Sequence, residues 1–258
     1  MSLLGWLTER RRAHLLEHPF PPAWDATLRA DVVLVARLAP AEQARLRDLV
    51  QVFVAEKHWE GLGGLELDDR VRVVIAAQAC LLLLGRDHGL FADVESILVY
   101  PSAVVAPARR PSHFDPGLRV AEQDQPVLGQ AFAGGPVILA WDRVLAGAQG
   151  REPGHNVVVH EFAHKIDMHD GPVDGTPPLP DADDRRAWAE ACGAAFLALR
   201  ADLEAGRRPA LDPYAATNEA EFFAVATEAY ITRCAHLAEV LPAVHAVLAD
   251  FYRFQPPT

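Results

Sequence analysis

The chain has 258 residues, half of them hydrophobic and 23% charged, which are the proportions of an ordinary globular protein. Its net charge of −11 argues against nucleic acid and anionic membranes as main partners, because both select basic surfaces. The three cysteines lie far apart and form no C-x-x-C pair, so neither a disulfide framework nor a Cys-rich zinc site is expected. The apolar runs are too short for a signal peptide or a membrane span, so we expect a cytoplasmic protein.

Helical periodicity dominates the first ninety residues. Apolar side chains recur every three or four positions, and Asp68 is placed to cap one of the helices. A short helix at the N-terminus is interpreted as a solvated lead-in, not as a docking element. The segment Lys57–Gly64 is interpreted as a glycine-rich helix end. The helices are expected over residues 1–12, over 25–38, from Pro40 up to Lys57, and over 69–84.

Strands are predicted in the middle of the chain. Residues 94–105 form one candidate strand, interrupted at Pro101, and 125–141 form another with a turn at Gly134–Gly135. Residues 106–126 between them are rich in Pro, Arg and His and show no clear period. Residues 125–141 are compatible with a strand edge that pairs with an extended substrate and equally with a plain core strand.

Residues 160–164 spell HEFAH, an instance of H-E-x-x-H, within a helix predicted over 154–168. Residues four apart share one helix face, so the imidazoles of His160 and His164 can bind one metal ion. Zinc suits imidazole ligands and lowers the pKa of its bound water to about 7. Glu161 lies one step round the helix, where its carboxylate can take a proton from that water. The motif therefore favours a zinc hydrolase over a helix with two incidental histidines.

A catalytic zinc ion needs a third protein ligand. The pattern H-E-x-x-H-x-x-G-x-x-H fails, because Asp167 and Asp170 occupy its glycine and third histidine positions. A helix predicted over 219–232 offers Glu221 and Glu228, seven residues apart on one otherwise apolar face. Carboxylates on so apolar a helix need partners, and we favour Glu221 as the ligand and Glu228 as a supporting residue.

Two further side chains are open to more than one interpretation. Asp167 can orient a histidine, or it can tie down the proline- and acid-rich loop over residues 169–184. Tyr214 can donate a hydrogen bond to an oxyanion, although a tyrosine is more often simply packed. Further helices are expected over residues 142–148, 185–205 and 237–251.

Several segments resemble the Mlc titration factor A family of bacterial zinc peptidases, and together they cover most of residues 50–254. They include HEFAHKIDMHDG, YAATNEAEFFAVATEAY, ILVYP and GPVILAWDRV. The resemblance implies a predominantly helical α+β fold with a zincin-like core, related to the anthrax lethal factor protease domain, and a small sheet packed on the active-site helix. It also implies one Zn²⁺ per chain, general-base catalysis and an assisting tyrosine. In this chain the ligands would be His160, His164 and Glu221, the base Glu161 and the tyrosine Tyr214.

The resemblance also implies a function. We expect an aminopeptidase-like hydrolysis of short peptides and binding of a glucose-responsive transcriptional repressor. The alternative is a binding protein that sequesters such a repressor, with incidental or no peptidase activity. We expect one compact unit, with a helical half over about 1–90 and a catalytic half over about 91–258.

Overall fold

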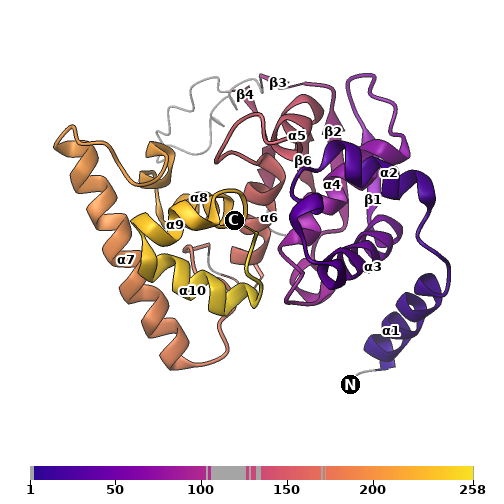
Figure 1. Ribbon diagram of the computed structural model, residues 1–258, viewed down its shortest axis with the longest axis horizontal. Helices are drawn as coiled ribbons and strands as arrows, with labels where there is room; N and C mark the ends of the chain where they lie inside the picture. The colour runs from indigo at the N-terminus through magenta and orange to yellow at the C-terminus, as the bar shows by residue number, and fades with distance from the viewer. Residues whose placement is uncertain are drawn as a thin grey trace, which may run out of the picture.

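The computed structural model describes residues 3–102, 104–105, 126–127, 129–131, 135–169, 171 and 173–257. Over these residues the fold is α+β and predominantly helical, which confirms the predicted class (Figure 1). The longer helices are α1 (Leu3–Leu16), α2 (Pro22–Asp31), α3 (Pro40–Glu56), α4 (Asp69–Leu81), α5 (Trp141–Ala148), α6 (Val157–Asp167), α7 (Ala182–Glu204), α8 (Glu219–Thr232), α9 (Cys234–Val240) and α10 (Pro242–Tyr252). The strands are β1 (His58–Gly61), β2 (Ser96–Tyr100), β3 (Val104–Val105), β4 (Pro126–Val127), β5 (Gly129–Ala131) and β6 (Val137–Ala140).

Four of the strands form one sheet in the order β1-β2-β6-β5. The first three are parallel, and β5 runs antiparallel to β6. Ile97 lies opposite Val137 and Val99 opposite Leu139, and all four side chains are buried. Alternate residues of a strand point to the same face, so this face of the sheet belongs to the core. Helix α6 contacts β5 and β6, which places the small sheet against the helix that carries the HEFAH motif.

β6 is an interior strand of this sheet. β6 is hydrogen-bonded to β2 on one side and to β5 on the other, so it offers no free edge. Among the described residues β5 is the edge strand on the α6 side. Of the two strands, β5 therefore has one side without a partner among the described strands, and β6 has none.

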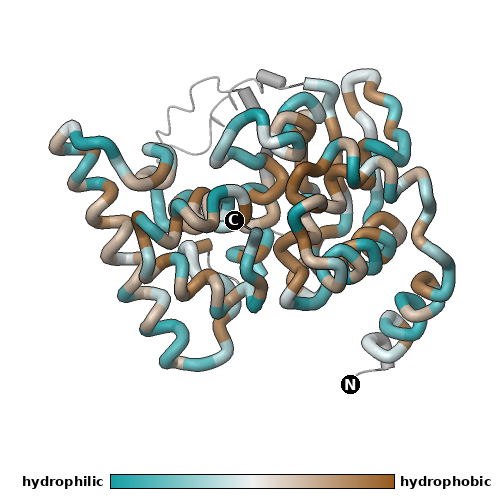
Figure 2. Tube along the Cα trace, viewed as in Figure 1, coloured by the Kyte–Doolittle hydropathy of each residue, from teal (hydrophilic) through white to brown (hydrophobic). Residues whose placement is uncertain are grey.

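The hydrophobic core gathers around α4, as Figure 2 shows by the apolar colouring of that region. Ten of the 13 residues of α4 are buried. The helix begins as predicted, because the Asp68 carboxylate accepts a hydrogen bond from the Val71 amide at 2.9 Å. One continuous cluster of buried apolar residues runs from Leu28 on α2 to Phe254 beyond α10. The N-terminal and C-terminal halves of the chain therefore share this core.

One predicted boundary in the N-terminal region is wrong, and one interruption predicted in the middle region is confirmed. Lys57–Gly64 is not only a helix end, since it contains β1, which pairs in parallel with β2. A side chain at Gly61 would put its Cβ 2.0 Å from the Leu65 carbonyl oxygen, so the following loop closes tightly over this strand. The interruption predicted at Pro101 within residues 94–105 is confirmed, because β2 ends at Tyr100 and β3 pairs with β4 in a separate ladder.

Two predicted helices are shorter than expected. The helix expected over 25–38 ends at Asp31, and a 3₁₀ turn follows at Val35–Arg37. The helix expected over 237–251 is two helices, because Pro242 starts α10 directly after α9. A proline lacks the backbone N–H that would continue the preceding helix, and its ring clashes with the carbonyl one turn back.

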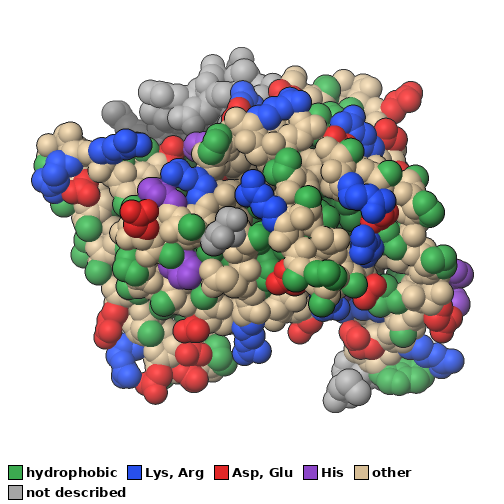
Figure 3. Space-filling model, viewed as in Figure 1, with side chains coloured by type: hydrophobic (Ala, Val, Ile, Leu, Met, Phe, Trp, Pro, Cys, Tyr) green, Lys and Arg blue, Asp and Glu red, His purple; other side chains and the backbone are tan. Residues whose placement is uncertain are grey.

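Helix α1 projects from the body of the molecule, in agreement with its interpretation as a solvated lead-in (Figure 1). It is attached to α3 by the Arg12 guanidinium, which donates to the two Glu56 carboxylate oxygens at 2.8 and 2.9 Å. On the face in Figure 3, acidic and basic side chains are interspersed. None of the helices in the described part of the chain is long and apolar enough to cross a membrane.

Candidate metal centre

Helix α6 begins with residues that are poor helix formers. Val157, Val158 and Val159 are β-branched and lose side-chain freedom in a helix. Two features compensate. The Asn156 side chain caps the helix by accepting from the Val159 amide at 3.0 Å, and the side chains of Val158 and Val159 are fully buried. The helix begins three residues later than predicted, at Val157, and places His160 and His164 on consecutive turns.

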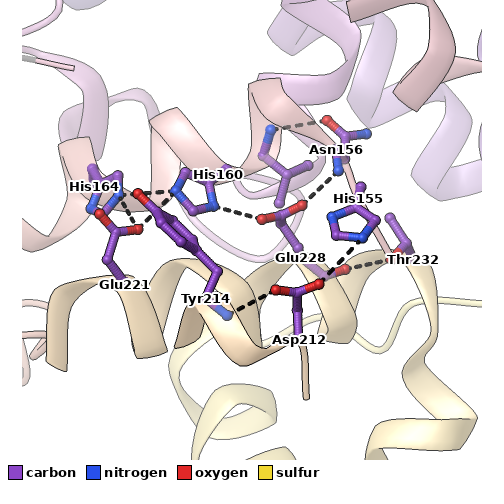
Figure 4. A network of polar contacts seen from close by, with 10 residues as sticks. His155, Asn156, His160, His164, Asp212, Tyr214, Glu221, Glu228 and Thr232 are labelled. Carbon is purple, nitrogen blue, oxygen red and sulfur yellow. Dashed lines mark hydrogen bonds and ion pairs between the residues drawn. The ribbon is translucent and has the colours of Figure 1, made fainter. Parts of the chain in front are cut away.

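Helix α8 packs directly against α6 and has the predicted bounds. Its N-cap is Asn218, whose side-chain oxygen accepts from the Glu221 amide at 2.9 Å. Its apolar residues are buried almost all round the helix, so Glu221 and Glu228 are held among packed side chains. Both carboxylates face α6 (Figure 4).

Three side chains converge between these helices, as Figure 4 shows. The Nε2 atoms of His160 and His164 are 3.1 Å apart, and Glu221 Oε2 lies 3.1 Å from the first and 3.3 Å from the second. One donor atom from each residue lies within 4.8 Å of the others. Two imidazole nitrogens and a carboxylate oxygen are a donor set that suits zinc. The structure thus brings together the three residues that the sequence predicts as metal ligands.

Glu228 orients one of the histidines. Its carboxylate, which is buried, accepts from His160 Nδ1 at 2.6 Å and from the Asn156 amide at 2.6 Å. A proton on Nδ1 leaves the lone pair of Nε2 free to point towards His164 and Glu221. Glu228 therefore has the supporting position predicted for it.

The charges of the cluster also fit a cation. Burial raises the pKa of Glu221, but hydrogen bonds from His160 and His164 outweigh this effect and lower it to about 2. Burial lowers the pKa of His160, but its bonds to Glu221 and Glu228 outweigh it and raise the pKa to about 10. The carboxylates thus favour positive charge at this position, and a metal ion can replace the proton that they hold there.

Glu161 lies on the same helix as the two histidines and is 5% exposed. Burial raises the pKa of its carboxyl group to about 7, although the charges of His160 and His164 oppose the shift. A carboxyl group that titrates near neutral pH can both accept and donate a proton under physiological conditions.

Tyr214 lies beside the cluster on a 3₁₀ turn at Pro213–Ala216. Its ring centroid is 6.1 Å from that of His160, and half of its surface is exposed. Burial, followed by the charge of Glu221, raises the pKa of its phenol to about 12, so the hydroxyl group keeps its proton. The turn is fixed by Asp212, whose carboxylate accepts from the Tyr214 amide at 2.8 Å and lies 3.7 Å from His155 Nε2. Sequence reasoning missed both residues: the contact of His155 with Asp212 joins separate loops, whereas the bond from the Tyr214 amide to Asp212 is local and typical of an aspartate that begins a turn.

Asp167 does not orient a histidine. Its Oδ1 accepts from the amides of Gly175 and Thr176 at 2.9 and 3.0 Å, so it ties down the loop after α6. Of the two interpretations of this residue, the structure supports the loop-tying one. His169 also lies apart from the cluster, with its Nδ1 3.6 Å from Asp93 Oδ2.

Comparison with known proteins identifies relatives of this chain. The chain is 34% identical to an uncharacterized protein of Synechocystis sp. over 97% of this chain and 90% of the relative. It is 33% identical to Mlc titration factor A of Salmonella agona, over 90% of this chain and 86% of the relative, and 32% identical to that of Edwardsiella ictaluri, over 93% and 88%. These similarities confirm the resemblance found in the sequence. The model of the glucose-regulated metallo-peptidase M90 family matches residues 6–253, and the chain belongs to that family.

Proposed function

We propose that this protein is a zinc-dependent peptidase that hydrolyses short peptides. The observation that carries the proposal is the convergence of His160, His164 and Glu221 in a chain that belongs to a metallopeptidase family. These three residues would hold the zinc ion, and Glu228 would keep His160 in the tautomer that binds metal. When bound, zinc supplies a Lewis acid that polarises the scissile carbonyl and makes water more acidic.

The side chains around the cluster would carry the proton transfers. Glu161 takes a proton from the attacking water and later delivers it to the leaving amine, and a pKa of about 7 suits both steps. The Tyr214 hydroxyl group donates a hydrogen bond to the oxygen that becomes negative in the transition state. Its pKa of about 12 keeps it a donor throughout.

The substrate would bind in an extended conformation along β5. Among the described strands β5 pairs only with β6, so its other side can accept a peptide backbone. Since α6 contacts β5, the bound peptide would pass the metal site. An aminopeptidase-like mode of cleavage is included in the proposal because of the family resemblance.

Removal and return of metal test this proposal. We expect the purified protein to cleave aminoacyl p-nitroanilides or short peptides, to lose this activity when a chelator removes zinc, and to regain it when zinc is added. Glu221→Ala should abolish both zinc binding and cleavage. Glu219→Ala is the matched control, because Glu219 is exposed on the same helical turn and outside the cluster. Cleavage that persists without metal, or in Glu221→Ala, would contradict the proposal.

We propose binding of an Mlc-like transcriptional repressor as a second function. The relatives from Salmonella agona and Edwardsiella ictaluri, which are named Mlc titration factor A, support it, and a cytoplasmic location is part of the proposal. Isothermal titration of the Glu161→Gln variant with purified Mlc from Salmonella tests the interaction without cleavage. We expect saturable binding in the titration and co-elution of the two proteins in size-exclusion chromatography. The absence of both a heat change and co-elution would argue against this function.

A further inference from the structure

Gly175, in the loop that follows α6, lies between three helices. Its amide donates to Asp167 at the end of α6 at 2.9 Å, and its carbonyl accepts from Trp188 Nε1 on α7 at 3.0 Å. Its third neighbour is Glu219, the first residue of α8. A Cβ atom at Gly175 would lie 2.3 Å from the Glu219 carbonyl oxygen, and its φ of +77° also favours glycine. Gly175 therefore touches α8 with bare backbone.

The contacts around Gly175 are buried. Asp167 has no exposed surface, and the same Oδ1 atom also accepts from the Thr176 amide at 3.0 Å. Trp188 is 3% exposed, and its ring packs edge-on against Phe223 of α8 with a centroid distance of 5.5 Å. Only Oδ1 of Asp167 has hydrogen-bond partners among the described residues, since Oδ2 is buried without one. Loss of the Oδ1 contacts would leave the buried Gly175 amide without its acceptor, so this bond favours a defined loop geometry.

This arrangement bears on the ligand cluster. Helix α6 carries His160 and His164, and α8 carries Glu221, two residues after the Glu219 carbonyl that Gly175 touches. The backbone of Gly175 therefore lies between the end of α6 and the start of α8, with no side chain of its own to separate them further. Metal–ligand distances tolerate deviations of only about 0.2 Å, so a wider separation of the two helices would move Glu221 out of range.

We propose that Asp167 and Gly175 are positioning residues for the metal site, which fix the separation of α6 and α8 and thereby the affinity for zinc. This inference rests on the proposed function of His160, His164 and Glu221 as metal ligands. It assigns to Asp167 a role beyond loop structure, although its carboxylate is hydrogen-bonded to the loop and not to the ligands.

The decisive comparison uses two glycine variants. Gly175→Ala introduces a Cβ against the Glu219 carbonyl, whereas Gly206→Ala introduces one at a similar φ of +65° with no atom within 4 Å. Both glycines have a positive φ that disfavours alanine, so the difference between the variants reports the contact with α8. We expect Gly175→Ala to weaken zinc binding about tenfold to a hundredfold in a chelator competition, and Gly206→Ala to bind as the wild type does.

A second pair of variants decides the matter if Gly175→Ala does not fold. Asp167→Ala removes the acceptor of the Gly175 amide and one of the two acceptors of the Thr176 amide, whereas Asp167→Asn keeps an acceptor oxygen in place. We expect weaker zinc binding for Asp167→Ala and near wild-type binding for Asp167→Asn. The visible absorption spectrum of the Co²⁺-loaded protein should change in Asp167→Ala, because it reports the ligand geometry directly.

The outcomes separate the two proposals. If the wild type binds no zinc, the metal site itself is wrong and this inference falls with it. If the wild type binds zinc, and folded Gly175→Ala and Asp167→Ala bind it equally well with an unchanged Co²⁺ spectrum, only the positioning role is overturned. If the metal-free variants lose thermal stability while their zinc affinity is unchanged, Asp167 and Gly175 stabilise the fold but do not position the metal ligands.

Discussion

Helices α4 and α6 are both buried, but α4 buries almost only apolar side chains, whereas α6 also buries ionisable ones. Ten of the 13 residues of α4 and nine of the 11 residues of α6 are buried. On α4 the only polar side chain among them is Gln78. On α6 four of the nine are ionisable, namely Glu161, His164, Lys165 and Asp167.

This difference indicates that α4 mainly stabilises the folded state, whereas α6 supports a functional site. Burial of apolar surface on α4 favours folding directly. Burial of an ionisable group opposes folding unless the group finds a partner. On α6 such partners are present, since Lys165 donates to the Gly135 carbonyl at 2.7 Å and Asp167 accepts from Gly175. A helix that buries so many ionisable groups in specific contacts indicates a functional site, and α4 indicates a core.

Among variants that keep all three proposed metal ligands, the largest effect on activity is expected from Glu161→Gln. Glutamine keeps the size of the side chain but cannot take a proton, so peptide cleavage should fall by about 10²- to 10⁴-fold. Zinc affinity should stay within about twofold of the wild type, because Glu161 is not among the proposed ligands. Steady-state kinetics and chelator competition on the same preparation measure both effects. Unchanged turnover would remove Glu161 from the mechanism.

On α4 the corresponding experiment is Ile75→Ala. Ile75 is fully buried, so its truncation should lower the free energy of unfolding by about 2–5 kcal/mol. Zinc affinity of the folded protein should not change, because α4 contributes only packing. Urea denaturation measures the stability. A large loss of zinc affinity in the folded variant would show that the two helices are not separable in this way.

A smaller effect is expected when the support of His160 is weakened. Glu228→Gln removes the negative charge beside His160 Nδ1 and should weaken zinc binding about tenfold to a hundredfold. Replacing the exposed Glu239 by glutamine provides a control for the loss of one charge. Equal zinc affinities of the two variants would show that Glu228 does not tune the site.

The sequence predicted α6 and α8 well because each has a local signal. The HEFAH motif and the spacing of Glu221 and Glu228 both follow helical periodicity, and Asn218 is a typical N-cap residue. A periodic pattern predicts which side chains share one face of a helix, but it does not predict which segment packs against that face. For this reason the sequence favoured Glu221 as a ligand but left Asp167 between two roles.

The missed features depend on contacts between distant segments. Strand β1 has only four residues, and none of them is fully buried. A strand this short shows little of the alternation of apolar and polar side chains by which a strand is predicted. Its pairing with β2 is parallel and joins residues nearly 40 positions apart. The interior position of β6 likewise follows from sheet order, which local propensity does not encode. The division between α9 and α10 is the exception, because the local signal of Pro242 would have been sufficient to predict it.

The smallest predicted effect concerns the acid stability of the N-terminal region. Burial lowers the pKa of His88 to about 4, below the value of 6.5 for an unperturbed histidine. The unfolded chain therefore binds more protons between these pH values, and the contribution of His88 to stability is complete above pH 6.5 and is lost as the pH falls towards 4. At pH 5 the loss is on the order of 1–2 kcal/mol. His88→Asn should flatten this part of the stability profile, and an unchanged pH dependence would contradict the assignment.

Zinc K-edge X-ray absorption on the purified protein tests the metal site most directly. We predict about one zinc ion per chain, bound by two imidazole nitrogens and by oxygen ligands at about 2.0–2.2 Å. The imidazole contribution should be halved, or the metal lost, in His164→Ala. Sulfur ligands at about 2.3 Å, an unchanged spectrum in His164→Ala, or no zinc even after reconstitution would contradict a metal centre built from His160, His164 and Glu221.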